Sequence, residues 1–161
     1  MKKFLSVIMT IILSVTLFTG CNIVRNFIPL RHNFGQYGVS FTIAGTVTER
    51  EGNKYGSADF STRLGSLQFE RIYDILTSSL LNADSIIALA AANYNATPRT
   101  LSNGASYFIY NNGTNSSGNK LISLAYAIQV GAAVWTITCT TTEANFDREA
   151  IIDVCMSAEF C

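Results

Sequence analysis

The sequence predicts an α+β fold in which helices pack on an antiparallel β-sheet, and two patterns lead to this class. Residues 37–44 and the segments after Leu101 alternate apolar and polar side chains, as half-buried strands do. Residues 66–81 and 146–160 repeat apolar side chains every three or four positions, as amphipathic helices do. The length of 161 residues fits a single α/β domain, which we place at residues 37–161.

Composition excludes several classes of protein. With 48% apolar and 14% charged residues, the chain can bury enough apolar surface to fold, so a disordered chain is excluded. Its 11 basic and 11 acidic side chains balance, which gives no net electrostatic attraction to nucleic acid or to anionic lipid. We therefore expect a folded domain that does not bind nucleic acid.

The N-terminus has the organisation of an export signal. Lys2 and Lys3 precede an uncharged run over residues 4–18, FLSVIMTIILSVTLF, which is followed by small residues. The run has 15 residues, fewer than the ~20 that a helix needs to cross the hydrocarbon core. Residues 1–20 are therefore predicted to be a signal peptide rather than a membrane span.

The five residues LFTGC at the end of this segment resemble the bacterial lipobox, in which a cysteine after small residues is lipidated and becomes the first residue of the mature protein. Thr19, Gly20 and Cys21 match this motif, so we expect lipidation of Cys21. Several acyl chains, at ~0.8 kcal/mol per buried methylene, would give a stable membrane anchor. An ordinary secretory signal that leaves Cys21 free, or an uncleaved anchor, is the alternative.

The segment that follows the cysteine has no clean period. We expect residues 21–36 to be the lipidated cysteine and a tether, with Arg25 and Arg31 in solvent rather than on lipid headgroups. This segment also contains His32, which is the single histidine of the chain.

The first half of the domain is expected to contain two strand regions and a helix. Residues 37–44 form the first strand, and turn-forming residues at 52–56 predict a hairpin over residues 46–62. Apolar side chains at helical spacing predict a helix over residues 66–81, with Ser66 as its N-cap.

The segment from Asp84 to Asn93 is apolar on every side, so a buried helix and a buried strand both fit its pattern. Its alanine content, and Asp84 or Ser85 as a cap, favour the helix.

The second half is expected to be an antiparallel meander followed by a helix. Strand patterns cover residues 106–110, 120–130 and 134–141, with a polar hairpin loop at residues 111–119. The final helix should pack on the last two of these strands. The side chains expected to be buried at this contact are Phe146, Ile151, Val154, Trp135 and Ile137.

The order of these segments resembles the PsbP/Mog1-like domains of small bacterial lipoproteins. The last two strands and the final helix, Leu121 to Phe160, carry most of the likeness, because the helix begins near Phe146 and Asp147 after a threonine-rich strand. The resemblance implies an α/β/α sandwich and a non-enzymatic accessory or binding role, and it supplies no catalytic residue.

We expect no catalytic, cofactor-binding or metal-binding residues. A catalytic triad needs a base beside an activated serine or cysteine, and His32 lies in the expected tether. The sequence contains neither a C-x-x-C nor an H-x-x-x-H spacing for zinc. The carboxylates of Asp147, Glu149 and Asp153 are interpreted as an exposed helix face.

Aromatic residues are frequent on the adjacent strands of the predicted meander, and a stacking platform for bases or sugars is one interpretation. These residues are Tyr107, Phe108, Tyr110, Tyr126 and Trp135. Because strand aromatics usually belong to the core, we interpret them as core residues. No basic groove accompanies them, which again disfavours nucleic acid.

Lipidation of Cys21 leaves Cys139, Cys155 and Cys161 in an oxidising compartment. A terminal cysteine has little packing role, so we favour a disulfide that involves Cys161, with either Cys155 or Cys139 as its partner. The alternative is that Cys139 and Cys155 are buried free thiols.

These patterns predict a lipid-anchored accessory or binding protein on the extracytoplasmic side of a membrane of the bacterial cell envelope. Its partners would be the membrane, through the lipid on Cys21, and an envelope protein or polymer that the sequence does not identify. An enzyme that modifies envelope polymers and a purely structural lipoprotein are the alternatives. A deep pocket with converging polar groups would favour the enzyme.

The anchor can be tested by mass spectrometry of the mature protein. We expect a chain that begins at Cys21 and carries the mass of its acyl groups, because the basic start, the uncharged run and LFTGC occur in register. The Cys21→Ala variant should keep its signal peptide and gain no lipid mass. A mature chain with unmodified Cys21, or one that still starts at Met1, contradicts the prediction.

Overall fold

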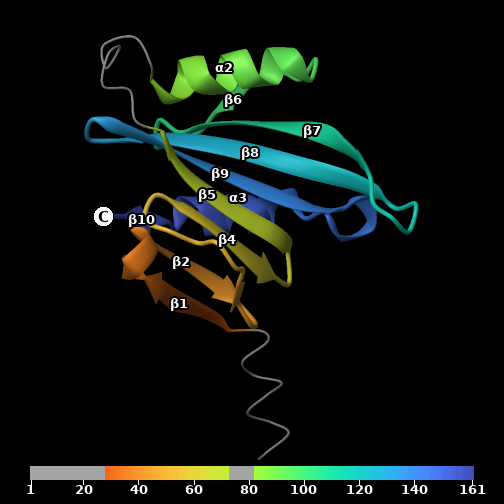
Figure 1. The fold of residues 1–161 in the computed structure, drawn as a ribbon. Helices are drawn as coiled ribbons and strands as arrows, with labels where there is room; N and C mark the ends of the chain where they lie inside the picture. The colour runs from red at the N-terminus through yellow and green to blue at the C-terminus, as the bar shows by residue number, and fades with distance from the viewer. Residues whose placement is uncertain (1–27, 73–81) are drawn as a thin grey trace, which may run out of the picture.

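The computed structural model describes residues 28–72 and 82–161, which form strands and helices around two sheets (Figure 1). The first half contains β1 (Pro29–Phe34), η1 (Gly35–Tyr37), β2 (Val39–Ala44), β3 (Thr48–Glu49), β4 (Ser57–Thr62), β5 (Gly65–Ile72) and α2 (Ala83–Asn93). The second half contains β6 (Arg99–Thr100), β7 (Ser106–Thr114), β8 (Lys120–Val130), β9 (Ala133–Thr142), η2 (Glu143–Asn145), α3 (Arg148–Met156) and β10 (Glu159–Phe160).

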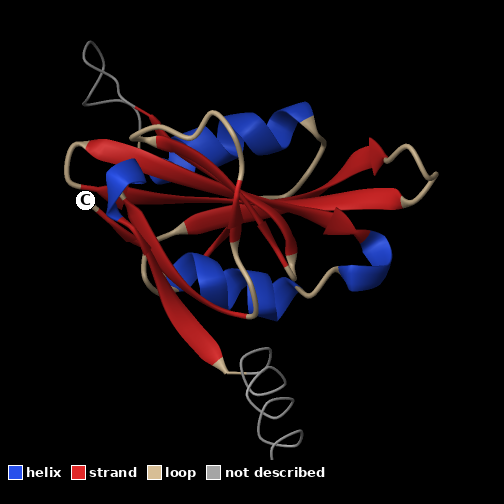
Figure 2. Cartoon of the chain, turned by 60° about the horizontal axis from the view of Figure 1, so that its bottom comes forward, coloured by secondary structure: helices blue, strands red, loops and turns tan. Residues whose placement is uncertain are grey.

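The strands form one large and one small antiparallel sheet. The seven-stranded sheet has the order β3-β4-β5-β9-β8-β7-β6, and the three-stranded sheet has the order β1-β2-β10. Helix α2 contacts β7 and β8 on one face of the large sheet, while α3 and the small sheet lie on the other face. Figure 2 shows the two longer helices on opposite sides of the strands. The predicted α+β class is confirmed.

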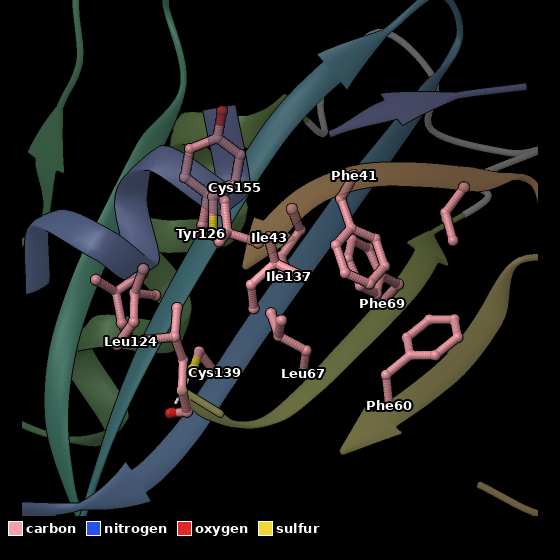
Figure 3. Close-up of a cluster of buried hydrophobic side chains, with 14 of the residues drawn as sticks. Phe41, Ile43, Phe60, Leu67, Phe69, Leu124, Tyr126, Ile137, Cys139 and Cys155 are labelled. Carbon is pink, nitrogen blue, oxygen red and sulfur yellow. Dashed lines mark hydrogen bonds between the residues drawn. The ribbon is translucent and has the colours of Figure 1, made fainter. Parts of the chain in front are cut away.

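The predicted meander is confirmed, with β8 paired to both β7 and β9 in antiparallel register. Successive side chains of these strands point to opposite faces, as the pleat requires. On β8, Leu124 and Tyr126 enter the larger core cluster, whereas Ala127 packs under α2. Figure 3 shows Leu124 and Tyr126 in the larger cluster with Ile137 of β9.

A C-terminal helix on the sheet is confirmed, but α3 ends at Met156, and Glu159–Phe160 form β10 instead of the end of the predicted helix. Helix α3 begins after Asp147, whose side chain accepts a hydrogen bond from the Ala150 N–H at 3.1 Å and so caps the first turn. Ile151 and Val154 are buried on the side that faces β2 and β8. Phe146, which precedes the helix, is half-buried and packs at the margin of the same cluster.

A cluster of four phenylalanine rings joins the two sheets. Phe34 and Phe41 belong to the small sheet, and Phe60 and Phe69 belong to β4 and β5 of the large sheet. The ring centroids of Phe34 and Phe60 lie 4.4 Å apart, and those of Phe41 and Phe69 lie 5.1 Å apart. These offset and tilted contacts are the favoured arrangements of aromatic pairs.

The helix expected over residues 66–81 is wrong for the described part of that segment. Residues 65–72 form β5, which pairs with β4 on one side and β9 on the other. Leu67 and Phe69 are buried and Gln68 is exposed, so burial alternates with period two rather than with a helical period. Pairing on both edges overrides the local helical spacing. Residues 73–81 lie outside the described residues.

The tether expected over residues 21–36 is wrong for residues 29–34, which form β1 and pair along their whole length with β2. Phe34 is a member of the phenylalanine cluster, and Arg31 binds the Glu159 carboxylate with both guanidinium nitrogens, one of them at 2.8 Å. These hydrogen bonds, together with the charge of Arg31, lower the pKa of Glu159. Residues 21–27 lie outside the described residues.

The segment from Asp84 to Asn93, whose pattern fitted both a helix and a strand, lies in helix α2. Its N-cap is Asn82, two residues before Asp84 and three before Ser85, the caps that the sequence suggested, and Asn82 and Ser85 form a capping box. The Ser85 N–H donates to Asn82 Oδ1 at 2.8 Å, and the Asn82 N–H donates to Ser85 Oγ at 3.1 Å. No helix among the described residues is long and apolar enough to span a membrane.

Replacing Phe41 by alanine should lower the free energy of unfolding by about 3–5 kcal/mol, because its ring is fully buried between the two sheets. Leu30→Ala is the matched control on the neighbouring strand, since this side chain is 40% exposed and should cost about 1 kcal/mol. Denaturant unfolding measures both values. Equal losses of unfolding free energy in Phe41→Ala and Leu30→Ala would show that the phenylalanine rings do not hold the two sheets together.

Candidate functional site

The candidate site is the face of the large sheet that α2 leaves uncovered. Helix α2 packs on Phe108, Ala127 and Val134, near one end of β7 and β8. Beyond it, no described helix covers the same face of β4, β5 and β9, as Figure 1 shows. We call this region the open face. Its side chains include Asp59, Ser61, Ser66, Gln68, Glu70, Thr136, Thr138 and Thr140.

Strand register places hydroxyl groups in a continuous row across the open face. Directly opposed residues on six successive strands are Thr48, Ser61, Ser66, Thr140, Ser123 and Tyr110, which we call the hydroxyl row. Adjacent strands lie ~4.8 Å apart, so these groups repeat at about that interval. Thr48 and Ser61 are exposed and Thr140 is half-buried, so the row reaches the surface over most of its length.

Hydrogen bonds hold the row in place. The hydroxyls of Ser123 and Thr140 lie 2.7 Å apart, and the Asn112 amide donates to Ser123 Oγ at 3.0 Å. Ser66 donates to the Asp59 carboxylate at 2.9 Å. Ser123 itself is fully buried, so it orients Thr140 and Asn112 rather than meeting solvent. Each hydroxyl has one donor and two acceptor positions, which leaves capacity for a ligand.

A stacked pair of tyrosines stands at one end of the row. The ring centroid of Tyr94, the residue that follows α2, lies 4.0 Å from that of Tyr110 on β7, with 29° between the ring planes. Phe108, which is buried under α2, contacts both rings, with centroid distances of 5.3 Å to Tyr110 and 6.1 Å to Tyr94. Tyr94 is 50% exposed, and partial burial raises the pKa of Tyr110. We call Tyr94 and Tyr110 the tyrosine pair.

The open face carries few charges. Arg50, at its margin, pairs with Asp59 at 3.4 Å, and Glu70 is exposed on the same face. Lys120 and Glu143 pair at 3.8 Å near the end of β9. Oxygen and amide groups therefore dominate the chemistry of this surface.

Two small cavities lie elsewhere among the described residues. One, of about 180 Å³ between α3 and β2, is lined by apolar side chains with Arg63, Asp153 and Ser157. The other, of about 240 Å³, lies beside Lys120 and Glu143. Sites for small molecules usually measure about 300–1,000 Å³, so both of these cavities fall below the usual size.

The residues that the sequence singled out are dispersed. His32 stacks on Phe34 and Phe41, with ring centroids 6.3 and 6.1 Å away. Cys139 and Cys155 are buried and Cys161 is exposed, and all three are free thiols, so the disulfide favoured for Cys161 is absent. The terminal residue has a packing role after all, because its N–H donates to the Gly38 carbonyl at 3.0 Å and its carbonyl accepts from the Tyr55 hydroxyl.

Among residues 28–72 and 82–161, no three histidine, cysteine or acidic side chains gather as a metal site. Cys21 lies outside the described residues, so its lipidation remains a prediction. Of the five strand aromatics, Tyr107, Phe108, Tyr126 and Trp135 are buried as core residues, whereas Tyr110 reaches the surface. No local pattern in the sequence singles out Tyr94, because its contact with a strand tyrosine arises only when the helix packs on the sheet.

The structure of the Ran-binding protein Mog1p from Saccharomyces cerevisiae matches this chain with a TM-score of 0.53, over 83% of this chain and 95% of that one. The fold is Mog1-like. Sequence identity is 8%, which shows shared architecture alone. The solution structure of cyanobacterial PsbP from Synechocystis matches with a TM-score of 0.48 and 13% identity, over 83% of this chain and 92% of that one. No protein-family model and no curated protein sequence matches the chain.

The exposed thiol of Cys161 should react faster than the buried thiols of Cys139 and Cys155 in this Mog1-like domain. Burial raises the pKa of Cys139 to about 12 and raises the pKa of Cys155 as well, so both stay protonated at about pH 8 and lack the nucleophilic thiolate. We expect Ellman's reagent to modify Cys161 alone in the folded protein, and the three thiols in denaturant if Cys21 is lipidated. Cys161→Ser should abolish the fast reaction. Fast modification of a buried thiol contradicts the packing.

Proposed function

We propose that this protein is a lipid-anchored binding protein of the bacterial cell envelope, and that it holds its partner on the open face. The observation that carries the binding role is the hydroxyl row beside the tyrosine pair, because it is an ordered polar surface with no covering helix among the described residues. The Mog1-like fold supports a binding role, since Mog1p is a Ran-binding protein. The signal peptide and LFTGC support the anchor.

The length of the N-terminal segment supports the orientation of this site. Pro29 lies eight positions after Cys21 in the sequence, and a fully extended chain over that distance spans at most about 28 Å. An anchor on Cys21 therefore keeps the start of β1 close to the membrane. Because β1 and α2 lie at opposite ends of the domain (Figure 1), the tyrosine pair, whose Tyr94 follows α2, lies at the end of the domain distant from the start of β1.

Photo-crosslinking in intact cells tests the proposal. A photoreactive amino acid in place of Gln68, which is exposed on the open face, should form adducts with an envelope component. The matched control is the same substitution at Met156, which is 47% exposed on α3 across the sheet. Adducts from Met156 but not from Gln68 would place the partner elsewhere, and adducts from neither position would overturn the binding role.

A further inference from the structure

The tyrosine pair is a rigid aromatic platform. The Tyr94 ring stacks on the Tyr110 ring with their centroids 4.0 Å apart. The Tyr110 ring in turn packs against the buried ring of Phe108. The backbone N–H of Tyr94 donates to the carbonyls of Ala91 and Ala92, which ties it to the last turn of α2. A large ring that is half in solvent and already ordered loses little conformational entropy when a ligand stacks on it.

The hydroxyl row leads away from this platform in one direction. From Tyr110 the row crosses β8, β9, β5 and β4 to Thr48, with one residue on each strand. Asn112 and Gln68 add amide groups beside it. Ser123 is buried, so a ligand that contacts Tyr94 would meet the exposed Asn112 amide on β7 and then the hydroxyl and amide groups of β9, β5 and β4. From β9 onward these groups repeat at about the 4.8 Å strand interval, which is close to the length of one sugar ring.

Charge and polarity decide between classes of ligand. A surface that binds nucleic acid or another polyanion needs several cationic side chains. Arg50, at the margin of the open face, is already paired with Asp59, which disfavours such a ligand. The centre of a protein interface is apolar, whereas this face presents threonine, serine and glutamine side chains. Sugar rings combine apolar C–H faces, which stack on aromatic rings, with hydroxyls that exchange hydrogen bonds with hydroxyl and amide groups.

We infer that the open face binds an uncharged glycan chain, with one sugar ring stacked on Tyr94 and the following rings along the hydroxyl row. This inference rests on the proposed binding role and specifies the ligand. It assigns the stacking contact to Tyr94, and assigns hydrogen bonds to Asn112, Thr140 and Gln68. Ser123 acts as a positioning residue because it is buried and holds Asn112 and Thr140.

The test is an NMR titration of the mature protein in detergent with chitohexaose, a neutral β-1,4-linked oligosaccharide. The amide signals of Tyr94, Thr140 and Gln68 should shift on addition. Tyr94→Ala should weaken binding about tenfold, the factor expected for the loss of one aromatic stacking contact. Leu89→Ala is the matched control, because Leu89 is 70% exposed on the same helix but outside the tyrosine pair, and it should bind as the wild type does.

Cellohexaose is the second probe, because it lacks the acetamide groups of chitohexaose and separates amide recognition from stacking on the ring. Binding of either oligosaccharide that depends on Tyr94 supports the inference. The inference is overturned if neither oligosaccharide shifts these signals, or if Tyr94→Ala binds as tightly as the wild type. A protein adduct from position 68 without glycan binding would leave the proposed function in place and reject this inference alone.

Discussion

The packing of four phenylalanine rings between the two sheets is the interaction on which the rest of the structure depends. Phe34 and Phe41 come from the small sheet, and Phe60 and Phe69 come from the large sheet, so this contact joins segments that do not pair through their backbones. Because apolar burial is the main favourable term in folding, the face of the large sheet that meets these rings becomes the core face. The opposite face is then left to α2 and to solvent.

The same choice of face gives the candidate site its polar character. On β9, Trp135, Ile137 and Cys139 point into the core, while Thr136, Thr138 and Thr140 alternate with them and point to the open face. A one-residue shift in register would exchange the two sets and bury a line of threonines. The open face is therefore polar because the core face is apolar, and its hydroxyls are aligned because the register is determined by the core.

Rigidity at the candidate site has a similar origin. Asn82 and Ser85 fix the start of α2, and Ile87 and Ala91 hold its inner side on the sheet. Tyr94 follows the last turn and reaches Tyr110 because the helix ends above that part of β7. The platform thus depends on the length of α2 and on its position over β7, which are set by packing rather than by any contact between the two tyrosines.

The sequence by itself determined the elements whose pattern is local. Strict alternation over residues 120–130 and 134–141 predicted β8 and β9, and the apolar stripe with Asp147 before it predicted α3, because side-chain period and capping act within a few residues. Only the tertiary structure decided β5 and β1. Leu67 and Phe69 fit a helical spacing, but pairing with β4 and β9 makes their segment a strand, and half-buried Phe34 packs against the core through Phe60. The hydroxyl row is decided at the same level, since its residues come from six strands and meet through register, which no local pattern encodes.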